Sequence, residues 1–388
     1  MVQTSCFGWE RLEIAEGGKE RIEKAEYFEK DWSREEICMK KWMVVILTAA
    51  FCLQGCSKKN SEELIQEYIK NAESFYKRDD YMEASGWMDS AINEAEEQYG
   101  KESQRVAELY LRKAELTRIF EVIMDSLYCS ETIYENLNDK EGVAKVYYKY
   151  GDCYRRDGDN EQAIEYYRQT VEVCNELGEE MNELQFDAYL DWGVCESDPQ
   201  NSLELYAKAE ELFALLPLEK QEAEGTKLYY SISFVYDGQE QYEESIKYST
   251  KAIEYYKEEK SSIQALIAAY HTRGYAEMWL GNTERAVEDH MKAKQLIEER
   301  QPDMGLWEKA IVYLKLAIAY AFAETPDYEK VLEYGLDAFH VYTEQKELSE
   351  KELEELKSVK ENVKKMYDHS PYVQQQDFET WYQENINK

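Results

Sequence analysis

A recurring arrangement of aromatic and small residues is the feature that most constrains the fold of this protein. The clearest copy lies within residues 145–178 and contains, in order, Tyr147, Tyr150, Gly151, Tyr154, Ala163 and Tyr167. The run Asp157-Gly158-Asp159 in the middle of this copy predicts a turn between two helices. Small residues at Gly151 and Ala163 would let these helices approach to about 8–10 Å, and the aromatic side chains would fill the remaining volume. The pattern therefore predicts a pair of closely packed helices.

The same pattern recurs along the sequence, and we count seven copies. The small residue of the second helix falls at Ala84, Ser126, Ala163, Ser202, Ser245, Ala286 and Val331, at intervals of 37 to 45 residues. This arrangement resembles the tetratricopeptide repeat, whose unit of about 34 residues places aromatic and small residues in this order on two helices. Because the intervals here are longer, we expect extended helices or longer connections than in the typical repeat.

The resemblance implies an all-α fold, a right-handed α-solenoid of about seven helical hairpins over residues 63–345. The composition agrees, because five prolines in 388 residues and abundant Glu, Lys, Ala and Leu favour helices. Residues 346–388 are expected to form a C-terminal capping helix and a tail, since a solenoid must end its stack with a polar-faced cap. The tail, with Phe378, Trp381 and Tyr382, could dock on the last repeat or form an exposed recognition segment.

A second motif concerns the membrane. Residues 39–55 begin with Met39 and two lysines, continue with a short apolar run and end in Gln54-Gly55 before Cys56. This segment resembles the signal peptide of a bacterial lipoprotein, and the resemblance implies cleavage before Cys56 and attachment of lipid to its thiol. Two or three acyl chains would anchor the protein stably, with residues 56–62 as a tether. The alternative is an apolar helix that happens to end in Gly-Cys.

The position of this motif raises a question about residues 1–38, because a signal peptide should be N-terminal. We expect translation to start at Met39, so that residues 1–38 form an upstream extension absent from the mature protein. The expected location is then the bacterial cell envelope, with the outer membrane favoured because Ser57, and no aspartate, follows Cys56. If residues 1–38 are translated, the protein would instead be a cytoplasmic adaptor.

The charge of the protein excludes one class of partner. The formal net charge is −35, which repels phosphate backbones, so we expect no nucleic-acid ligand. The alternative interpretations are an attraction for cationic partners or acidic faces that keep a helical protein soluble. Cys129, Cys153, Cys174 and Cys195 lack the spacing of a metal site; they are expected to be small buried residues, although a bridge between Cys153 and Cys174 stays open.

In the resembled family, the first helices line a concave groove that binds peptides or extended segments of partners. Matching the register of this sequence to that family gives eleven candidate groove residues: Arg118, Lys145, Tyr148, Arg155, Arg156, Tyr230, Phe234, His271, Tyr275, Leu314 and Ile318. Basic residues come early and aromatic residues late, which would suit a segment with one acidic and one apolar end. The alternatives are packing between first helices for the aromatic residues and surface ion pairing for the arginines.

Catalysis is not expected, because the sequence has no nucleotide-binding, hydrolase or zinc-protease motif. We also expect no cofactor and no metal, since His271 and His290 lack a placed carboxylate to complete a site. The leading hypothesis is a membrane-anchored, repeat-containing lipoprotein that serves as a binding scaffold for a protein or peptide. Two alternatives are a solenoid that senses a signalling peptide and the cytoplasmic adaptor.

Overall fold

The computed structural model describes residues 60–300, 305–343, 345 and 347–386, and it divides into the units 1–63 and 64–388. Apart from the first residues of α2, every element described below belongs to the second unit. The predictions made for residues 1–59, including the signal peptide and the lipid site at Cys56, lie outside the described residues.

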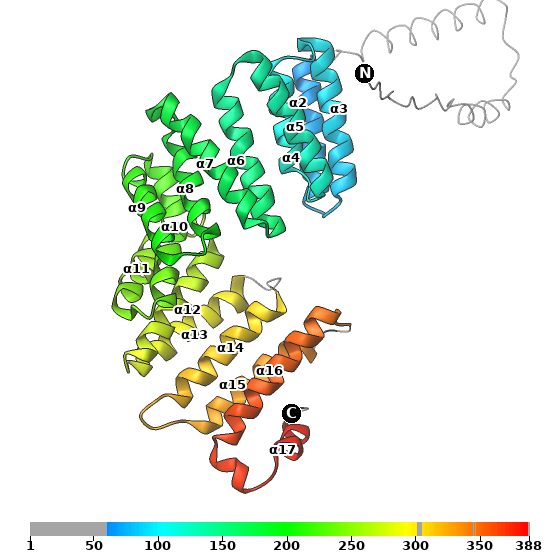
Figure 1. Cartoon of the computed structure of the whole chain (residues 1–388). Coiled ribbons are helices and arrows are strands. Elements are labelled where there is room, and N and C mark those ends of the chain that lie inside the picture. The colour runs from blue at the N-terminus through cyan, green and yellow to red at the C-terminus, as the bar shows by residue number, and fades with distance from the viewer. Residues whose placement is uncertain (1–59, 301–304, 344, 346, 387–388) are drawn as a thin grey trace, which may run out of the picture. The chain divides into compact units, whose positions relative to one another are not determined.

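Fourteen of the described helices form seven consecutive hairpins (Figure 1). The pairs are α2 (Ser61–Tyr76) with α3 (Tyr81–Tyr99), α4 (Gln104–Glu115) with α5 (Phe120–Leu137), α6 (Lys140–Asp157) with α7 (Asn160–Leu177), α8 (Asn182–Cys195) with α9 (Pro199–Phe213), α10 (Leu218–Gly238) with α11 (Tyr242–Tyr255), α12 (Ile263–Trp279) with α13 (Thr283–Arg300), and α14 (Leu306–Ala321) with α15 (Tyr328–Thr343). A short 3-10 turn, Glu179–Met181, precedes α8.

The α6–α7 hairpin shows how the sequence pattern produces this unit. Gly158 ends α6 with a φ of 86°, a value that glycine adopts without steric cost. The carboxylate of Asp159 then accepts a hydrogen bond from the Gln162 amide at 3.1 Å and caps α7. Gly151 faces Tyr167 so closely that an added Cβ would lie 2.7 Å from its ring. The glycine is therefore needed for the close approach of the two helices.

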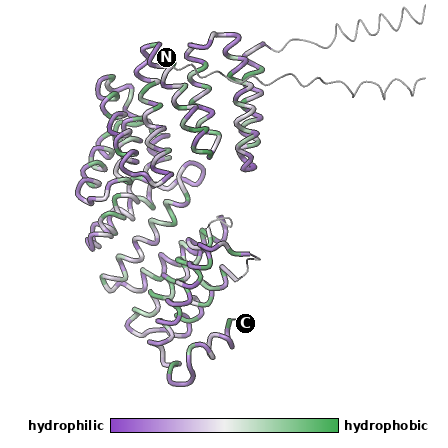
Figure 2. Tube along the Cα trace, turned by 45° about the vertical axis from the view of Figure 1, so that its right-hand side comes forward, coloured by the Kyte–Doolittle hydropathy of each residue, from purple (hydrophilic) through white to green (hydrophobic). Residues whose placement is uncertain are grey.

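The predicted repeat register is confirmed. All seven small residues that mark the second helices are buried: Ala84, Ser126, Ala163, Ser202, Ser245, Ala286 and Val331. Hydrophobic residues recur along the helices between hydrophilic ones (Figure 2), as expected when each helix buries one side. The all-α solenoid expected from the sequence is the observed architecture of the described residues.

Hairpins pack on their neighbours in sequence. The second helix of one pair contacts the first helix of the next, as α7 does with α8 and α11 with α12. First helices also contact one another directly, α10 with α12 and α12 with α14. Side chains on successive first helices are thereby brought onto one surface.

Two further helices follow the last hairpin. The first, α16 (Glu350–Asp368), starts at a capping box between Ser349 and Glu352. After a 3-10 turn, Pro371–Gln374, comes α17 (Phe378–Asn385). The docking interpretation of the tail is confirmed, because Phe378, Trp381 and Tyr382 are buried against α15 and α16. The apolar residues Val359 and Val363 of α16 are buried, whereas Leu353 near its start is exposed.

The four described cysteines are free thiols, so the bridge left open between Cys153 and Cys174 is absent from the structure. Cys153, Cys174 and Cys195 are buried, as expected of small core residues. None of the helices in the described part of the protein is both long enough and apolar enough to span a bilayer.

Candidate functional site

The register of the first helices defines one surface of interest. Each first helix from α6 to α14 carries a buried small residue against its partner helix: Gly151, Gly193, Ser233, Gly274 and Ala317. The residue that follows each of these is turned away from the partner helix and is exposed or half-buried: Asp152, Val194, Phe234, Tyr275 and Ile318. We call the surface of α6, α8, α10, α12 and α14 that carries these five positions the first-helix face.

The early part of this face is held by a buried carboxylate. Asp191 of α8 has a relative exposure of only 4%. Its Oδ2 accepts a hydrogen bond from the Tyr148 hydroxyl of α6 at 2.7 Å, and its Oδ1 accepts one from the Lys227 ammonium of α10 at 2.8 Å. Burial, followed by the Asp191 charge, raises the pKa of Tyr148 above its ordinary value. The Asp191 carboxylate therefore joins three consecutive first helices, α6, α8 and α10.

The neighbouring charges are also satisfied within the protein. Lys220 donates to Asp187 at 2.9 Å, while burial raises the pKa of that carboxyl group to about 6. Arg155 donates to Asp152 at 2.6 Å, and Arg156 bonds to the other oxygen of the same carboxylate. Arg155 and Arg156 of the predicted basic cluster are thus paired with a carboxylate of their own helix and are not left open for an acidic ligand.

The later part of the face carries exposed aromatic rings. Phe234 of α10 is 59% exposed, Trp279 at the end of α12 is 48% exposed, and Phe322 directly after α14 is 55% exposed. The Trp279 ring lies 5.9 Å from the Phe322 ring and 6.1 Å from the Tyr275 ring, measured between centroids. We call Phe234, Tyr275, Trp279 and Phe322 the aromatic patch. Phe234 holds on α10 the register position that Tyr275 holds on α12, and these two helices contact each other. Exposed rings on neighbouring helices are typical of a contact surface for another molecule.

Two charged groups accompany the aromatic patch without a direct ion-pair partner among the described residues. Oδ1 of Asp237, on the last turn of α10, is buried and accepts no hydrogen bond, and burial raises the pKa of this carboxyl group to about 6. The Lys315 ammonium of α14 lies 4.1 Å from the centre of the Tyr275 ring. Burial lowers the pKa of Lys315, and Asp237 partly offsets that effect.

His271 has a structural role in this region. Its Nδ1 lies 3.1 Å from Nδ1 of His290 on α13, so the N–H of one ring donates a hydrogen bond to the unprotonated nitrogen of the other. Burial lowers the pKa of His271 to about 3 and the pKa of His290 well below its ordinary value, so both rings are neutral. No cluster of three potential metal ligands occurs among the residues that the structure describes.

The structure brings some predicted groove residues together and separates others. Tyr148 and Arg155 lie in the charged half of the first-helix face, and Tyr230, Phe234, Tyr275 and Ile318 lie in the aromatic half. Arg118 does not lie on a first helix, because α4 already ends at Glu115. Leu314 is buried in the core, and Lys145 is exposed in an ion pair with Glu141 at 2.6 Å.

Several residues of the surface were not identified from the sequence: Asp187, Asp191, Lys227, Asp237, Trp279, Lys315 and Phe322. The spacing of some of these residues from the small packing residues could have identified them. Asp191 lies two residues before Gly193, as Lys315 lies two before Ala317, and Trp279 and Phe322 lie five residues after Gly274 and Ala317. Extending the register to these two offsets would have included four of the seven residues; Asp187 and Lys227 lie six residues before Gly193 and Ser233, and Asp237 lies four after Ser233.

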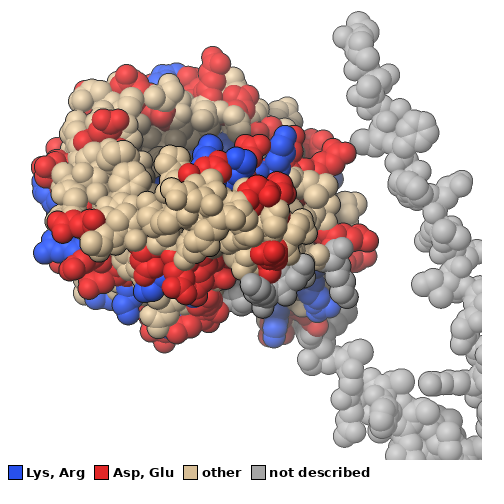
Figure 3. Space-filling model, turned by 90° about the horizontal axis from the view of Figure 1, so that it is seen from below, with Lys and Arg blue, Asp and Glu red and all other residues tan. Residues whose placement is uncertain are grey.

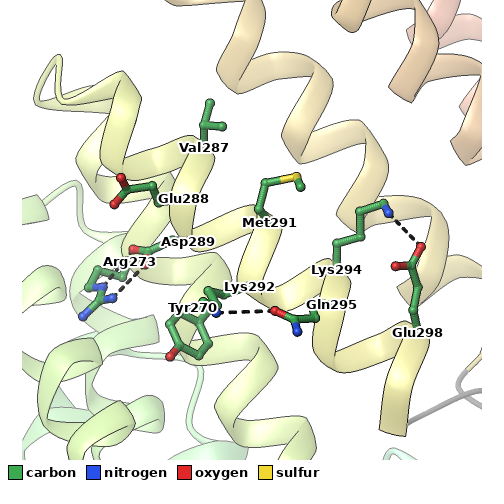
Figure 4. A pocket seen from close by; sticks show the side chains of 10 residues that line it. All are labelled: Tyr270, Arg273, Val287, Glu288, Asp289, Met291, Lys292, Lys294, Gln295 and Glu298. Carbon is green, nitrogen blue, oxygen red and sulfur yellow. Dashed lines mark hydrogen bonds and ion pairs between the residues drawn. The ribbon is translucent and has the colours of Figure 1, made fainter.

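A hollow of about 720 Å³ lies beside α13 and is lined by Tyr270, Arg273, Val287, Glu288, Asp289, Met291, Lys292, Lys294, Gln295 and Glu298 (Figure 4). Most of its charged side chains are paired: Arg273 bonds to Asp289 at 2.8 and 2.7 Å, and Lys294 bonds to Glu298 at 2.8 Å, whereas Lys292 bonds to the neutral Gln295. Because most of these charges are already paired and no exposed aromatic cluster lines this hollow, we favour the aromatic patch as the candidate site.

Tandem helical hairpins with exposed side chains on their first helices define an α-solenoid, a class of repeat proteins. A family model, tetratricopeptide repeat, matches residues 144–176 and 226–259, which correspond closely to the α6–α7 and α10–α11 hairpins. No sequence among the curated proteins compared matches this one. The protein therefore contains tetratricopeptide repeats, and such repeats generally form non-enzymatic scaffolds that bind protein or peptide partners.

Two solved structures with similar helical repeats can be compared with this one. The apo form of RapI is similar with a TM-score of 0.54 and 15% sequence identity, over 84% of this protein and 93% of RapI. A tetratricopeptide-repeat protein from Parabacteroides merdae is similar with a TM-score of 0.45 and 14% identity, over 78% of this protein and 99% of the other. At these identities the similarity concerns the fold alone.

Proposed function

We propose that this protein is a membrane-anchored scaffold of the bacterial cell envelope that binds a protein or peptide partner on the first-helix face and catalyses no reaction. The aromatic patch is the observation that supports this proposal. Large exposed rings cost solvation free energy unless a partner covers them. The hollow beside α13, by contrast, is lined mostly by charged side chains that bond within the protein, as Arg273 does to Asp289 and Lys294 to Glu298.

The anchoring part of the proposal is supported by the sequence of residues 39–56. Lipid on Cys56 would hold the repeats at a membrane surface, with the outer membrane favoured. Intact mass and N-terminal mapping of protein from detergent-extracted membranes of the native host test this. We expect a lipid-modified N-terminus at Cys56 that Cys56→Ala removes; peptides from residues 9–34 in the mature protein would overturn it.

The binding part is tested with a triple variant, Phe234→Ala, Trp279→Ala and Phe322→Ala, used as bait for detergent-solubilised envelope proteins. All three side chains are about half exposed, so helicity should persist. We expect the variant to lose the partner that the wild-type protein retains. Tyr128→Ala is the matched control, because Tyr128 is a 66% exposed aromatic residue on the second helix α5. Retention of the same partner by the triple variant would contradict the proposal.

A further inference from the structure

The charge pairing along the first-helix face is complete in one half and incomplete in the other. In the charged half, Asp152, Asp187 and Asp191 each bind a lysine or arginine within 3 Å. In the aromatic half, Asp237 and Lys315 carry opposite charges but make no direct ion pair with each other or with another described residue. Asp237 as a whole is half-buried, but its buried Oδ1 has no hydrogen-bond donor. A buried carboxylate oxygen without a donor is unfavourable, so its retention calls for an explanation.

The positions of these two groups suggest what would satisfy them. Asp237 lies on α10 and Lys315 on α14, the two first helices that both contact α12. Between them on α12 lie Tyr275, whose ring contacts Lys315, and Trp279. A ligand that reaches both groups must offer a hydrogen-bond donor on one side and an acceptor on the other, next to an apolar group.

We propose that the aromatic patch binds an extended, uncharged segment of the partner, with one backbone N–H of the segment donating to Asp237 and one backbone carbonyl oxygen accepting from Lys315. This inference rests on the proposed function and names the chemistry of its partner. Backbone N–H and carbonyl groups alternate in direction along an extended polypeptide, so one segment can present both. A bulky apolar side chain of the segment would pack on Phe234, Trp279 and Phe322.

The charges of this region favour a neutral segment over a basic or acidic one. A basic side chain paired with Asp237 would leave Lys315 unsatisfied and add a second cation beside it. An acidic side chain paired with Lys315 would leave Asp237 unsatisfied and add a second carboxylate beside it, within a protein whose net charge is −35. Figure 3 shows acidic side chains spread over one face of the protein, with fewer basic side chains among them.

The test uses the full-length protein and an array of capped twelve-residue peptides with three composition classes: uncharged and rich in apolar residues, lysine-rich, and glutamate-rich. We expect the uncharged class to bind best. The strongest binder is then N-methylated at one position at a time, which removes one backbone donor. We expect one position at which N-methylation weakens binding about tenfold or more, the usual effect of losing a hydrogen bond to a charged group.

The assignment to Asp237 comes from a double-mutant cycle. Asp237→Ala should weaken binding of the unmethylated peptide by a similar factor. In this variant, N-methylation at the sensitive position should cause no further loss of affinity, so that the two losses do not add. Lys315→Met should also weaken binding about tenfold. Asp125→Asn on α5 and Lys292→Met on α13, both exposed on second helices, are the matched controls and should bind like wild type. Circular dichroism checks that each variant is folded.

Each other outcome overturns the inference in a recognisable way. Peptide binding that depends on the aromatic patch but shows no coupling between Asp237 and N-methylation would remove the backbone clamp and leave the proposed function intact. Preference for lysine-rich peptides would assign Asp237 to a cationic side chain. Capture of a folded partner with no peptide bound would exclude an extended segment. If neither peptide nor partner depends on the aromatic patch, the proposed function fails as well.

Discussion

Among single residues, the glycines of the first helices have a measurable packing role. Gly151→Ala would place a Cβ 2.7 Å from the Tyr167 ring, which is fully buried and cannot move freely. We expect this variant to lose about 1–3 kcal/mol of the free energy of unfolding through overpacking. The measurement is urea unfolding followed by circular dichroism.

Gly86→Ala provides the matched control. Gly86 lies within α3 and has open space around the Cβ position. Alanine is the better helix former, so this variant should gain about 0.5–1 kcal/mol. Equal effects of the two substitutions would contradict the packing role assigned to Gly151.

The raised pKa of Asp237 predicts how the stability of the folded protein depends on pH. Its pKa is raised from 3.8 to about 6 in the folded protein, chiefly by burial. The folded state therefore holds this proton more tightly than the unfolded state, and stability decreases as pH rises from about 4 to about 6. Asp237→Asn should remove that decrease, an effect on the order of 1 kcal/mol once solvent screening of this half-buried group is allowed for.

The measurement is thermal or urea unfolding of wild type and Asp237→Asn from about pH 4 to about pH 7, with Asp125→Asn as a control on an exposed carboxylate. The difference between wild type and Asp237→Asn should change with pH, while Asp125→Asn should follow wild type. Parallel curves for all three proteins would show that Asp237 is not perturbed by burial.

Only some residues of the first-helix face could be identified from the sequence. Phe234 and Tyr275 were identified because they directly follow the small packing residues that set the register. Asp191 and Lys315 were missed because they precede these small residues by two positions and because charged residues are abundant in a protein with net charge −35. Only the three-dimensional contacts show that Asp191 is paired and that Asp237 is not.

Among the helices, the tail helix α17 completes the C-terminal end of the described stack. Trp381 is 8% exposed and its ring lies 4.9 Å from the ring of the fully buried Tyr367. Trp381→Ala should cost about 3 kcal/mol by leaving a cavity. Because each repeat contacts only its neighbours, the loss of stability should be confined to the helices next to α17.

Hydrogen exchange measures that localisation directly. Trp381→Ala should reduce protection in α15 and α16 much more than in α6, whereas Met82→Ala, at a position that is 70% exposed on α3, should change neither region. Unchanged protection of α16 in Trp381→Ala would show that the tail does not stabilise the end of the stack.

The helical hairpins themselves were predictable, because the signal for them is local and repeated. Seven buried small residues and glycine turns such as Gly158 set the number and register of the pairs. Helix ends were less predictable: α4 ends at Glu115, which places Arg118 in a connection. The capping helix α16 also begins with Leu353 exposed, since the apolar period alone does not show where packing starts.

The molecule as a whole combines, in our proposal, a membrane anchor at Cys56 with a repeat domain whose first helices carry the partner site. The repeat fold follows from periodic packing, whereas the anchor rests on a motif at residues 39–56 that no described contact tests. The proposed function depends above all on the partner contacting the aromatic patch and not the second helices.

Site-specific photo-cross-linking in the native host distinguishes these two surfaces. Benzoylphenylalanine is placed at Phe234, at Trp279 and, as a control, at the exposed Tyr128 of α5. We expect the same cross-linked partner from positions 234 and 279 and none from position 128. Cross-linking from position 128, with none from positions 234 and 279, would refute the proposed site and move the binding surface to the second helices.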